Sequence, residues 1–254
     1  MYQDVVDLNA FYNSFLGQVA RRQIRAVLRE HWADLRGQSL LGIGFATPYL
    51  RSFADEAART VALMPAEQGV IPWPPEGRSR VCLAEEAELP FADESFDRVL
   101  LVHAVESSET LRPMLREVWR VMAGSGRLMV VAPNRRGIWA RFENNPFAHG
   151  HPFSESQLTR LLRDSLFTPL RATTALYVPP SRLRVLLRAA SAWEKIGRRW
   201  GLPFPGVIVV EAAKQVYAPV PERRRAGALR RRLALALPLP GRAAQPAPAP
   251  VSGA

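Results

Sequence analysis

The stretch that decides the fold is ELPFADESFDRVLL, residues 88–101. It joins a Leu-Pro-Phe triplet and a Ser-Phe-Asp triplet to a run of apolar residues. The apolar run continues through FDRVLLVHAVE, residues 96–106, and its composition is typical of a buried strand. The sequence therefore predicts a strand within residues 96–106.

Further apolar runs lie on both sides of this strand and alternate with segments of helical periodicity. The turn after the first run is expected to lead into a helix ending near residue 58, and a later helix spans about 110–122. Ser154 and Gln157 form a capping box that starts another helix. Such alternation is typical of a parallel α/β sheet. The other predicted strands lie at 39–44, 59–64, 79–84, 126–134, 168–178 and 205–218.

Three segments together resemble the class I S-adenosylmethionine-dependent methyltransferases, and specifically the type-11 methyltransferase domain. They are SLLGIGFATPYL (39–50), AEEAELPFADESFDRVLLVHAVE (84–106) and LREVWRVMAGSGRLMVVAPN (115–134). The resemblance covers residues 36–135 well and 5–218 more loosely. It implies an α/β fold with a Rossmann-like, mostly parallel seven-stranded sheet, helices on both faces and an antiparallel last strand. It also implies S-adenosyl-L-methionine as cofactor, bound at the carboxyl ends of the first strands.

The chain is expected to form one methyltransferase-like domain over residues 1–218. Helices occupy 5–35, the core 36–178, a helical insertion 179–204 and the last strand 205–218. Residues 219–254 are rich in Arg, Pro and Ala, have no periodicity, and are predicted to be disordered.

The cofactor loop departs from the pattern that the resemblance implies. Where the family has an acid at the end of the first strand, this chain has Gly42. The glycine positions that follow are held by Gly44, Ala46 and Pro48. A loop of this composition still lets a backbone pass close to a ligand. The carboxylate expected at the end of the second strand is replaced by an apolar residue, Leu63 or Met64.

The match returns after the third strand. Glu85 falls where the resemblance places an acid near the adenine amino group, and Glu86 follows it. Alternatively, Glu85, Glu86 and Glu88 form a solvated charge run. His103 ends the fourth strand, beside the expected methyl donor. The predicted cofactor residues are therefore Gly42, Gly44, Ala46, Glu85, Glu86 and His103.

Histidines are the candidate bases for removing a proton from a methyl acceptor. His103, His149 and His151 can each serve as a base or orient an acceptor, or can be loop histidines that hold backbone. The His-Gly-His pair has no Cys, Asp or Glu at ligand spacing, so no metal is expected. Tyr12, from the N-terminal helix, is either a lid residue or an ordinary packing residue.

The net charge of +11 is unevenly distributed. Residues 219–254 hold seven arginines against one glutamate. The helix at 181–200 places basic residues on one face and apolar residues, including Ile196 and Trp200, on the other. This helix packs on its own domain, covers the acceptor site, or meets anionic lipid. The basic residues of that helix are Arg184, Arg188, Lys195 and Arg199.

The sequence thus predicts an S-adenosylmethionine-dependent methyltransferase of a small-molecule or lipid-type acceptor. The alternatives are a non-catalytic binding or scaffold protein of the same fold, and a peripheral binder of anionic membrane or nucleic acid through the basic helix and tail. A cytoplasmic location is expected, because the chain shows no signal peptide or membrane span and has one cysteine, Cys82.

Overall fold

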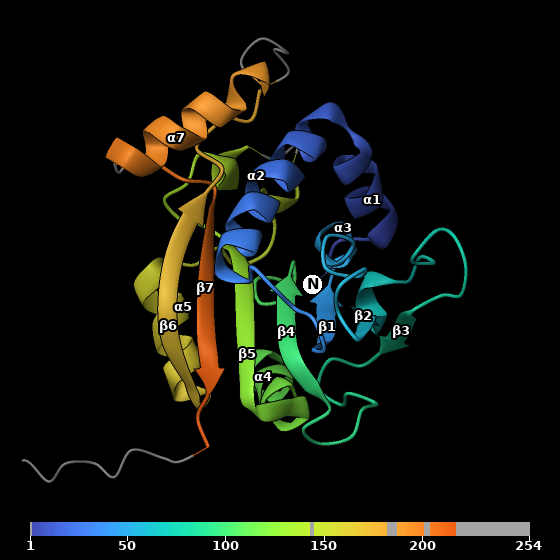
Figure 1. The fold of residues 1–254 in the computed structure, drawn as a ribbon. Helices are drawn as coiled ribbons and strands as arrows, with labels where there is room; N and C mark the ends of the chain where they lie inside the picture. The colour runs from blue at the N-terminus through green and yellow to red at the C-terminus, as the bar shows by residue number, and fades with distance from the viewer. Residues whose placement is uncertain (1, 143–144, 182–186, 201–203, 217–254) are drawn as a thin grey trace, which may run out of the picture. The chain divides into compact units, whose positions relative to one another are not determined.

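A single seven-stranded sheet organises the domain, as Figure 1 shows for the computed structural model. The structure describes residues 2–142, 145–181, 187–200 and 204–216. The strand order is β3-β2-β1-β4-β5-β7-β6, and only the pairs made by β7 are antiparallel. The predicted mostly parallel sheet with an antiparallel last strand is confirmed. The strands are β1 (Ser39–Gly44), β2 (Arg59–Pro65), β3 (Val81–Ala84), β4 (Phe96–Val102), β5 (Met122–Pro133), β6 (Phe167–Ala175) and β7 (Val207–Lys214).

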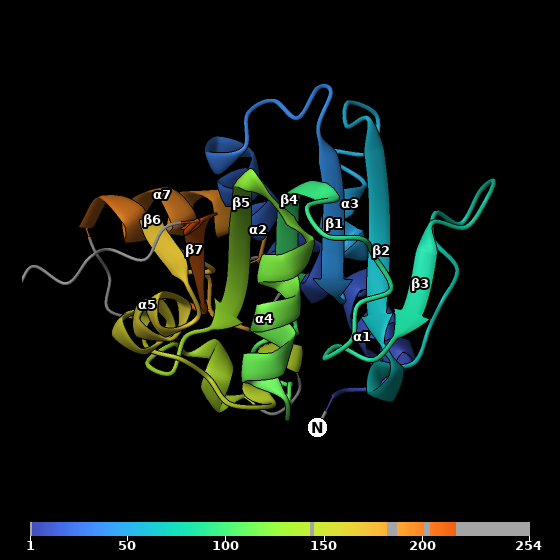
Figure 2. The same cartoon turned by 90° about the horizontal axis from the view of Figure 1, so that it is seen from below.

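Helices cover both faces of the sheet because its central strands are apolar on both sides. On one face pack α1 (Val5–Asn13), α2 (Phe15–His31), α3 (Thr47–Leu50) and α7 (Ala190–Trp200). On the other face pack α4 (Leu111–Val121) and α5 (Glu155–Asp164). Figure 2 shows α4 and α5 in front of the strands, with α2 and α3 behind them. Three short 3-10 turns complete the elements: η1 (Ala66–Gln68), η2 (Trp139–Arg141) and η3 (Pro146–Ala148).

Alternate residues of β1 enter the two cores. Leu40 faces α2 and α3, whereas Leu41 and Ile43 face α4. Neighbouring β4 follows the same alternation, with Leu100 on the first side and Leu101 on the second. Burying such strands on both faces removes large apolar areas from water. Each Å² of apolar area removed stabilises the folded state by about 25 cal/mol.

The helix after β1 differs in length from its prediction. The helix after β1 ends at Leu50 instead of residue 58, and the chain continues in turns whose N–H groups bond carbonyls three residues back. These turns keep Phe53 in the core and bring Glu56 within 2.5 Å of Arg29. The helix at Ser154 begins with the predicted capping box.

The insertion between β6 and β7 is helical, as predicted, over the part that the structure describes. Leu187 and Ala190 are buried and Trp193 packs against the same core. Ile196 and Trp200 were expected on this apolar face but are exposed. The side of α7 that packs on the domain is formed by Ala190, Glu194 and Gly197, and Ile196 and Trp200 lie beside it. Predictions for residues 182–186, including Arg184, and for the 219–254 tail lie outside the described residues. No helix in the described part of the chain is long and apolar enough to span a bilayer.

Candidate functional site

The site lies at the carboxyl ends of β1 and β4, where the order of the strands in the sheet reverses. These strands are neighbours, with Gly44 opposite Val102, although β2 and β3 intervene in the sequence. Open α/β sheets bind ligands at such a switch point. Gly44 has a φ of 80°, and a Cβ there would lie 2.3 Å from the carbonyl oxygen of Val102. Only glycine therefore allows the chain to leave β1 this close to β4.

The chain that follows β1 is packed rather than open. Phe45 and Ala46 are buried, and α3 begins at once. Gly42, inside β1, faces this packing: a Cβ there would lie 2.7 Å from the Cβ of Ala46 and 2.7 Å from a methyl of Leu50. No carboxylate fits at position 42. Where the resemblance implies an acid, this chain has a glycine whose space is filled by Ala46 and Leu50.

A chain of hydrogen bonds links α3, α1 and the end of β4. The Tyr49 hydroxyl donates to the Tyr12 hydroxyl at 3.0 Å. Tyr12 Oη lies 2.8 Å from His103 Nε2, and His103 Nδ1 lies 3.1 Å from Glu106 Oε1. The neutral histidine tautomer with a proton on Nδ1 satisfies every donor: Nδ1–H donates to Glu106, and Nε2 accepts from Tyr12. The arrangement fixes His103 as a hydrogen-bond acceptor at Nε2.

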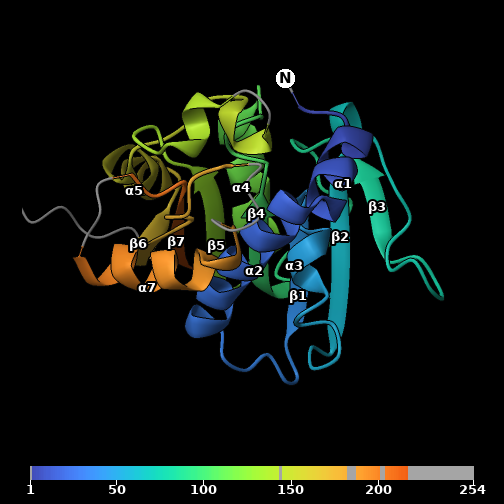
Figure 3. The same ribbon diagram turned by 90° about the horizontal axis from the view of Figure 1, so that it is seen from above.

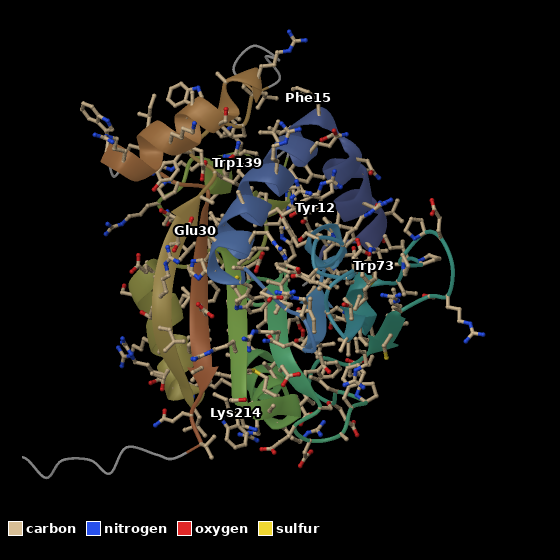
Figure 4. All side chains as sticks on the ribbon, viewed as in Figure 1. Tyr12, Phe15, Glu30, Trp73, Trp139 and Lys214 are labelled. Carbon is tan, nitrogen blue, oxygen red and sulfur yellow. The ribbon has the colours of Figure 1, made fainter. Side chains whose placement is uncertain are left out.

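Aromatic rings enclose this chain. The Tyr12 ring stacks on Phe45 with 5.6 Å between centroids, and Phe147 lies 5.0 Å from the His103 ring. Tyr12, His103 and Glu106 are all buried. Figure 4 shows Tyr12 reaching from the N-terminal helices toward the upper end of the strands. His103 itself has a φ of 52°, an unusual backbone conformation for a residue with a side chain, of the kind that gathers at functional sites.

A second buried carboxylate, that of Glu86, lies beside the chain of hydrogen bonds that ends at Glu106. Glu86 accepts hydrogen bonds from the hydroxyls of Tyr2 and Ser108, and from Thr110 at 2.9 Å. Its neighbour Glu85 is exposed, as the charge-run alternative expects. Tyr2 also donates weakly to the Ala104 carbonyl, at 3.5 Å. The N-terminal segment thus contacts Glu86 directly through Tyr2, and reaches Glu106 only through the Tyr12–His103 hydrogen bond.

Some buried polar atoms of the site have no partner among the described residues. They are Oε2 of Glu106 and both amide atoms of Gln68, which directly follows β2 in η1. Within the described residues, Glu86 and Glu106 accept hydrogen bonds from hydroxyls and an imidazole, and none from a lysine or arginine. Buried carboxylates are costly without a cation or donors. The site therefore favours a cationic ligand with groups for an amide to bind.

The predicted site residues separate into two groups. At this edge of the sheet lie Gly44, Ala46, Glu86 and His103. Glu85, in contrast, is exposed to solvent, and Gly42 is covered by the side chain of Ala46. His149 and His151 are exposed, and the backbone N–H of His151 bonds the Glu106 carbonyl. Among the described residues no group of His, Cys, Asp and Glu could hold a metal ion.

Sequence reasoning missed Glu106, Tyr2, Tyr49 and Gln68. Glu106 carried a signal, because it follows His103 by three residues at the end of the same apolar run. The other three come from distant segments, and only the tertiary structure brings them to the site.

Alkaline pH tests whether the tyrosines are buried as the structure shows. Burial raises the pKa of Tyr12 and of Tyr49, and burial together with Glu86 raises the pKa of Tyr2. Unfolded phenols ionise near pH 10, so above that pH the unfolded state binds fewer protons than the folded state. We expect the free energy of unfolding to be constant below about pH 9 and to fall above pH 10, by about 1.4 kcal/mol per pH unit for each such tyrosine. Urea unfolding from pH 8 to about 11 measures this dependence. Tyr12→Phe should make the free energy of unfolding fall less steeply above pH 10, by the contribution of one tyrosine, about 1.4 kcal/mol per pH unit. An equal slope in this variant would contradict the burial of Tyr12.

The comparisons agree with the geometry. The type-11 family model, described as "Methyltransferase domain", matches residues 41–130. A Mycobacterium tuberculosis protein described as a probable S-adenosylmethionine-dependent methyltransferase is 38% identical over 92 residues, 35% of this chain and 33% of its own length. The matched region thus spans about a third of that relative. A malonyl-[acyl-carrier protein] O-methyltransferase of Halorhodospira halophila is 26% identical over 249 residues, 86% of this chain and 84% of its own length.

A solved structure shares the fold. It is the 1,6-didemethyltoxoflavin-N1-methyltransferase of Burkholderia thailandensis, with bound 1,6-didemethyltoxoflavin and S-adenosylhomocysteine. The TM-score is 0.53 at 16% identity, and the match covers 83% of this chain and 85% of that chain. At this identity the likeness concerns the fold alone. Residues 41–130 thus match the family model of a methyltransferase domain, and the sheet that contains them shares its fold with a solved methyltransferase.

Proposed function

We propose that this chain is a methyltransferase that uses S-adenosylmethionine to methylate a small-molecule or lipid-type acceptor at an atom that carries a proton. The observation that supports this most is the pair of buried carboxylates, Glu86 and Glu106, neither of which has a lysine or arginine partner in the part of the chain that the structure describes. A cationic sulfonium compound offsets this buried negative charge, and the methyltransferase domain supplies the fold in which such a compound binds.

The residues present fit the cofactor, with fewer charged contacts than the family pattern has. Glu86, Gln68 and the backbone at Gly44 would hold it, since they combine a buried carboxylate, a buried unpartnered amide and a close backbone approach. The apolar ends of β1 and β2 supply no carboxylate. Each lost charged hydrogen bond costs about 1.5–3 kcal/mol, so two of them weaken binding by about two to four powers of ten. We therefore expect micromolar to sub-millimolar affinity.

The cofactor supplies a methyl group on a cationic sulfur, and the protein must remove the acceptor's proton. His103 Nε2 is an acceptor whose ring is held by Glu106 through Nδ1. An acceptor hydroxyl or amine that takes the place of the Tyr12 hydroxyl would give its proton to Nε2. Glu106 then stabilises the imidazolium that forms. Tyr12 must leave His103 for this to happen, so Tyr12 has to move away when the cofactor binds, before the acceptor takes its place.

One feature favours the scaffold alternative. The Tyr12–Phe45 stack and the buried Tyr49 place side chains where a cofactor loop would otherwise be open. A protein that keeps this packing in the presence of the cofactor would use the fold only for binding other partners. Direct titration separates the two functions.

Calorimetric titration of the full chain with S-adenosylhomocysteine and S-adenosylmethionine tests the proposal. Two adjacent carboxylates give a matched pair of variants: buried Glu86→Gln should weaken binding about 10- to 150-fold, and exposed Glu85→Gln less than about 2-fold. Absence of heat up to about 1 mM ligand would favour the scaffold alternative, because even the weakened site should bind in that range. A larger effect at Glu85 than at Glu86 would refute our assignment of Glu86 to the cofactor site.

A further inference from the structure

The outward face of α7 carries basic side chains with exposed apolar residues beside them. Lys195 and Arg199 are exposed on the same side of α7, about 40° apart at 100° per residue, and Arg188 is exposed just before the helix begins. Ile196 and Trp200 flank them and are 50% and 78% exposed. Single exposed apolar residues are common on protein surfaces, but an exposed tryptophan next to a basic stripe is typical of helices that lie in a membrane interface.

The neighbouring helix α2 continues this basic surface. Figure 3 shows α7 and α2 on the same face of the sheet, with the two helices in contact. Between them lies a groove of about 250 Å³ lined by residues of both helices. Its apolar side is formed by Val19 and Leu187, with exposed Phe15 at one end, and its rim carries Arg22 and Arg188.

A buried amide lines the same groove. Gln23 is 7% exposed and lines the groove beside Arg22. Its amide carries both donors and an acceptor, so it can contribute hydrogen bonds to a polar ligand in the groove. Two arginines, an amide and apolar walls together suit an anionic headgroup with an acyl chain below it.

The charges of this surface are not compensated. Arg22, Arg25, Arg188, Lys195 and Arg199 have no ion-pair partner among the described residues. The acidic residue of α7, Glu194, is turned inward and accepts the Tyr177 N–H at 3.2 Å. Exposed basic residues near an anionic surface each strengthen binding by about fivefold.

We propose that the surface formed by α2 and α7 docks on anionic membrane, with Ile196 and Trp200 inserted at the interface and a lipid phosphate bound at Arg22, Arg188 and Gln23. The surface lies at the same end of the sheet as the candidate site, because α7 packs on Tyr177 just after the carboxyl end of β6, and β6 runs parallel to β5. The inference does not depend on methyl transfer, since it uses none of the site residues.

Vesicle flotation with the full chain tests the proposal. We expect binding to phosphatidylcholine vesicles that contain about 30% phosphatidylglycerol, and none to pure phosphatidylcholine. Lys195→Glu/Arg199→Glu should lower the binding constant about 30-fold or more. Trp200→Ala should lower it about tenfold and should retain that effect at about 1 M salt, where electrostatic attraction is screened.

The matched control is Arg78→Glu/Arg80→Glu, which changes the net charge equally at exposed positions far from α7 in the sequence. This control should bind vesicles like the wild type, and all variants should unfold at the same urea concentration. Equal losses in both double variants would assign binding to overall charge or to residues 219–254 and would overturn the proposal. Binding to single-stranded RNA with no binding to anionic vesicles would overturn it as well.

Discussion

Gly42→Asp, the substitution that restores the family's acid at the end of β1, should unfold the protein instead of improving cofactor binding. A Cβ at this position lies 2.7 Å from Ala46 Cβ and from a Leu50 methyl, in a core where neither neighbour is exposed. Overpacking of this kind costs about 1–3 kcal/mol, and an unpaired buried carboxylate adds several more. A total of about 4 kcal/mol or more is a large part of the 5–15 kcal/mol that stabilises a typical domain.

Gly124→Asp is the control for this prediction. Gly124 is exposed near the start of β5, and the closest atom to a Cβ there is a Val216 methyl at 3.8 Å. We expect a change below about 0.5 kcal/mol in urea unfolding for this variant. If Gly42→Asp were as stable as Gly124→Asp, the packed conformation of the β1 turn would be wrong, and an open cofactor loop would become the better description.

His103→Asn should reduce methyl transfer by about 10²- to 10⁴-fold while leaving cofactor affinity within about threefold. Asparagine is chosen because it tolerates the φ of 52° that His103 adopts, so the backbone stays in place. Its amide cannot accept and carry the proton as an imidazole does. The measurement is tritium transfer from methyl-labelled S-adenosylmethionine to a lipid and small-molecule extract, alongside titration with S-adenosylhomocysteine.

Glu106→Gln tests whether Glu106 positions His103. The carboxylate holds His103 through Nδ1 at 3.1 Å, and an amide can keep this contact without the negative charge. The variant should lower kcat with little change in KM, and its loss should be smaller than that of His103→Asn. Unchanged transfer in both variants would assign the base to another residue and would contradict the role given to His103.

The sequence predicted the fold well because strands and helices are signalled by local patterns. The apolar run at 96–106 and the capping box at Ser154 each correspond to an element in the structure. Where prediction was wrong, the cause was tertiary. The helix after β1 is short because the packing of Phe53 and the Arg29–Glu56 pair replace helical hydrogen bonds with turns. Ile196 and Trp200 follow the helical period but lie beside the side of α7 that packs on the domain, so they stay exposed.

The site was less predictable from the sequence. The resemblance led to Gly44, Glu86 and His103, which the structure brings together. It could not reveal that Tyr2 and Tyr12 contact these positions, because pairs separated by 84 and 91 residues depend on how α1 packs. Nor could it distinguish Glu85 from Glu86, since adjacent residues differ only in the side of the chain on which they lie.

The central claim is that the buried edge at β1 and β4 is the cofactor site and that Tyr12 moves to open it. A crystal structure of the full chain grown with S-adenosylhomocysteine tests it most directly. We predict the ligand beside Gly44, Gln68 and Glu86, with the Tyr12 hydroxyl no longer within hydrogen-bond distance of His103 Nε2. The claim would be contradicted if the ligand lay elsewhere, or were not bound, while the 2.8 Å Tyr12–His103 contact and the Phe45 stack remained as they are.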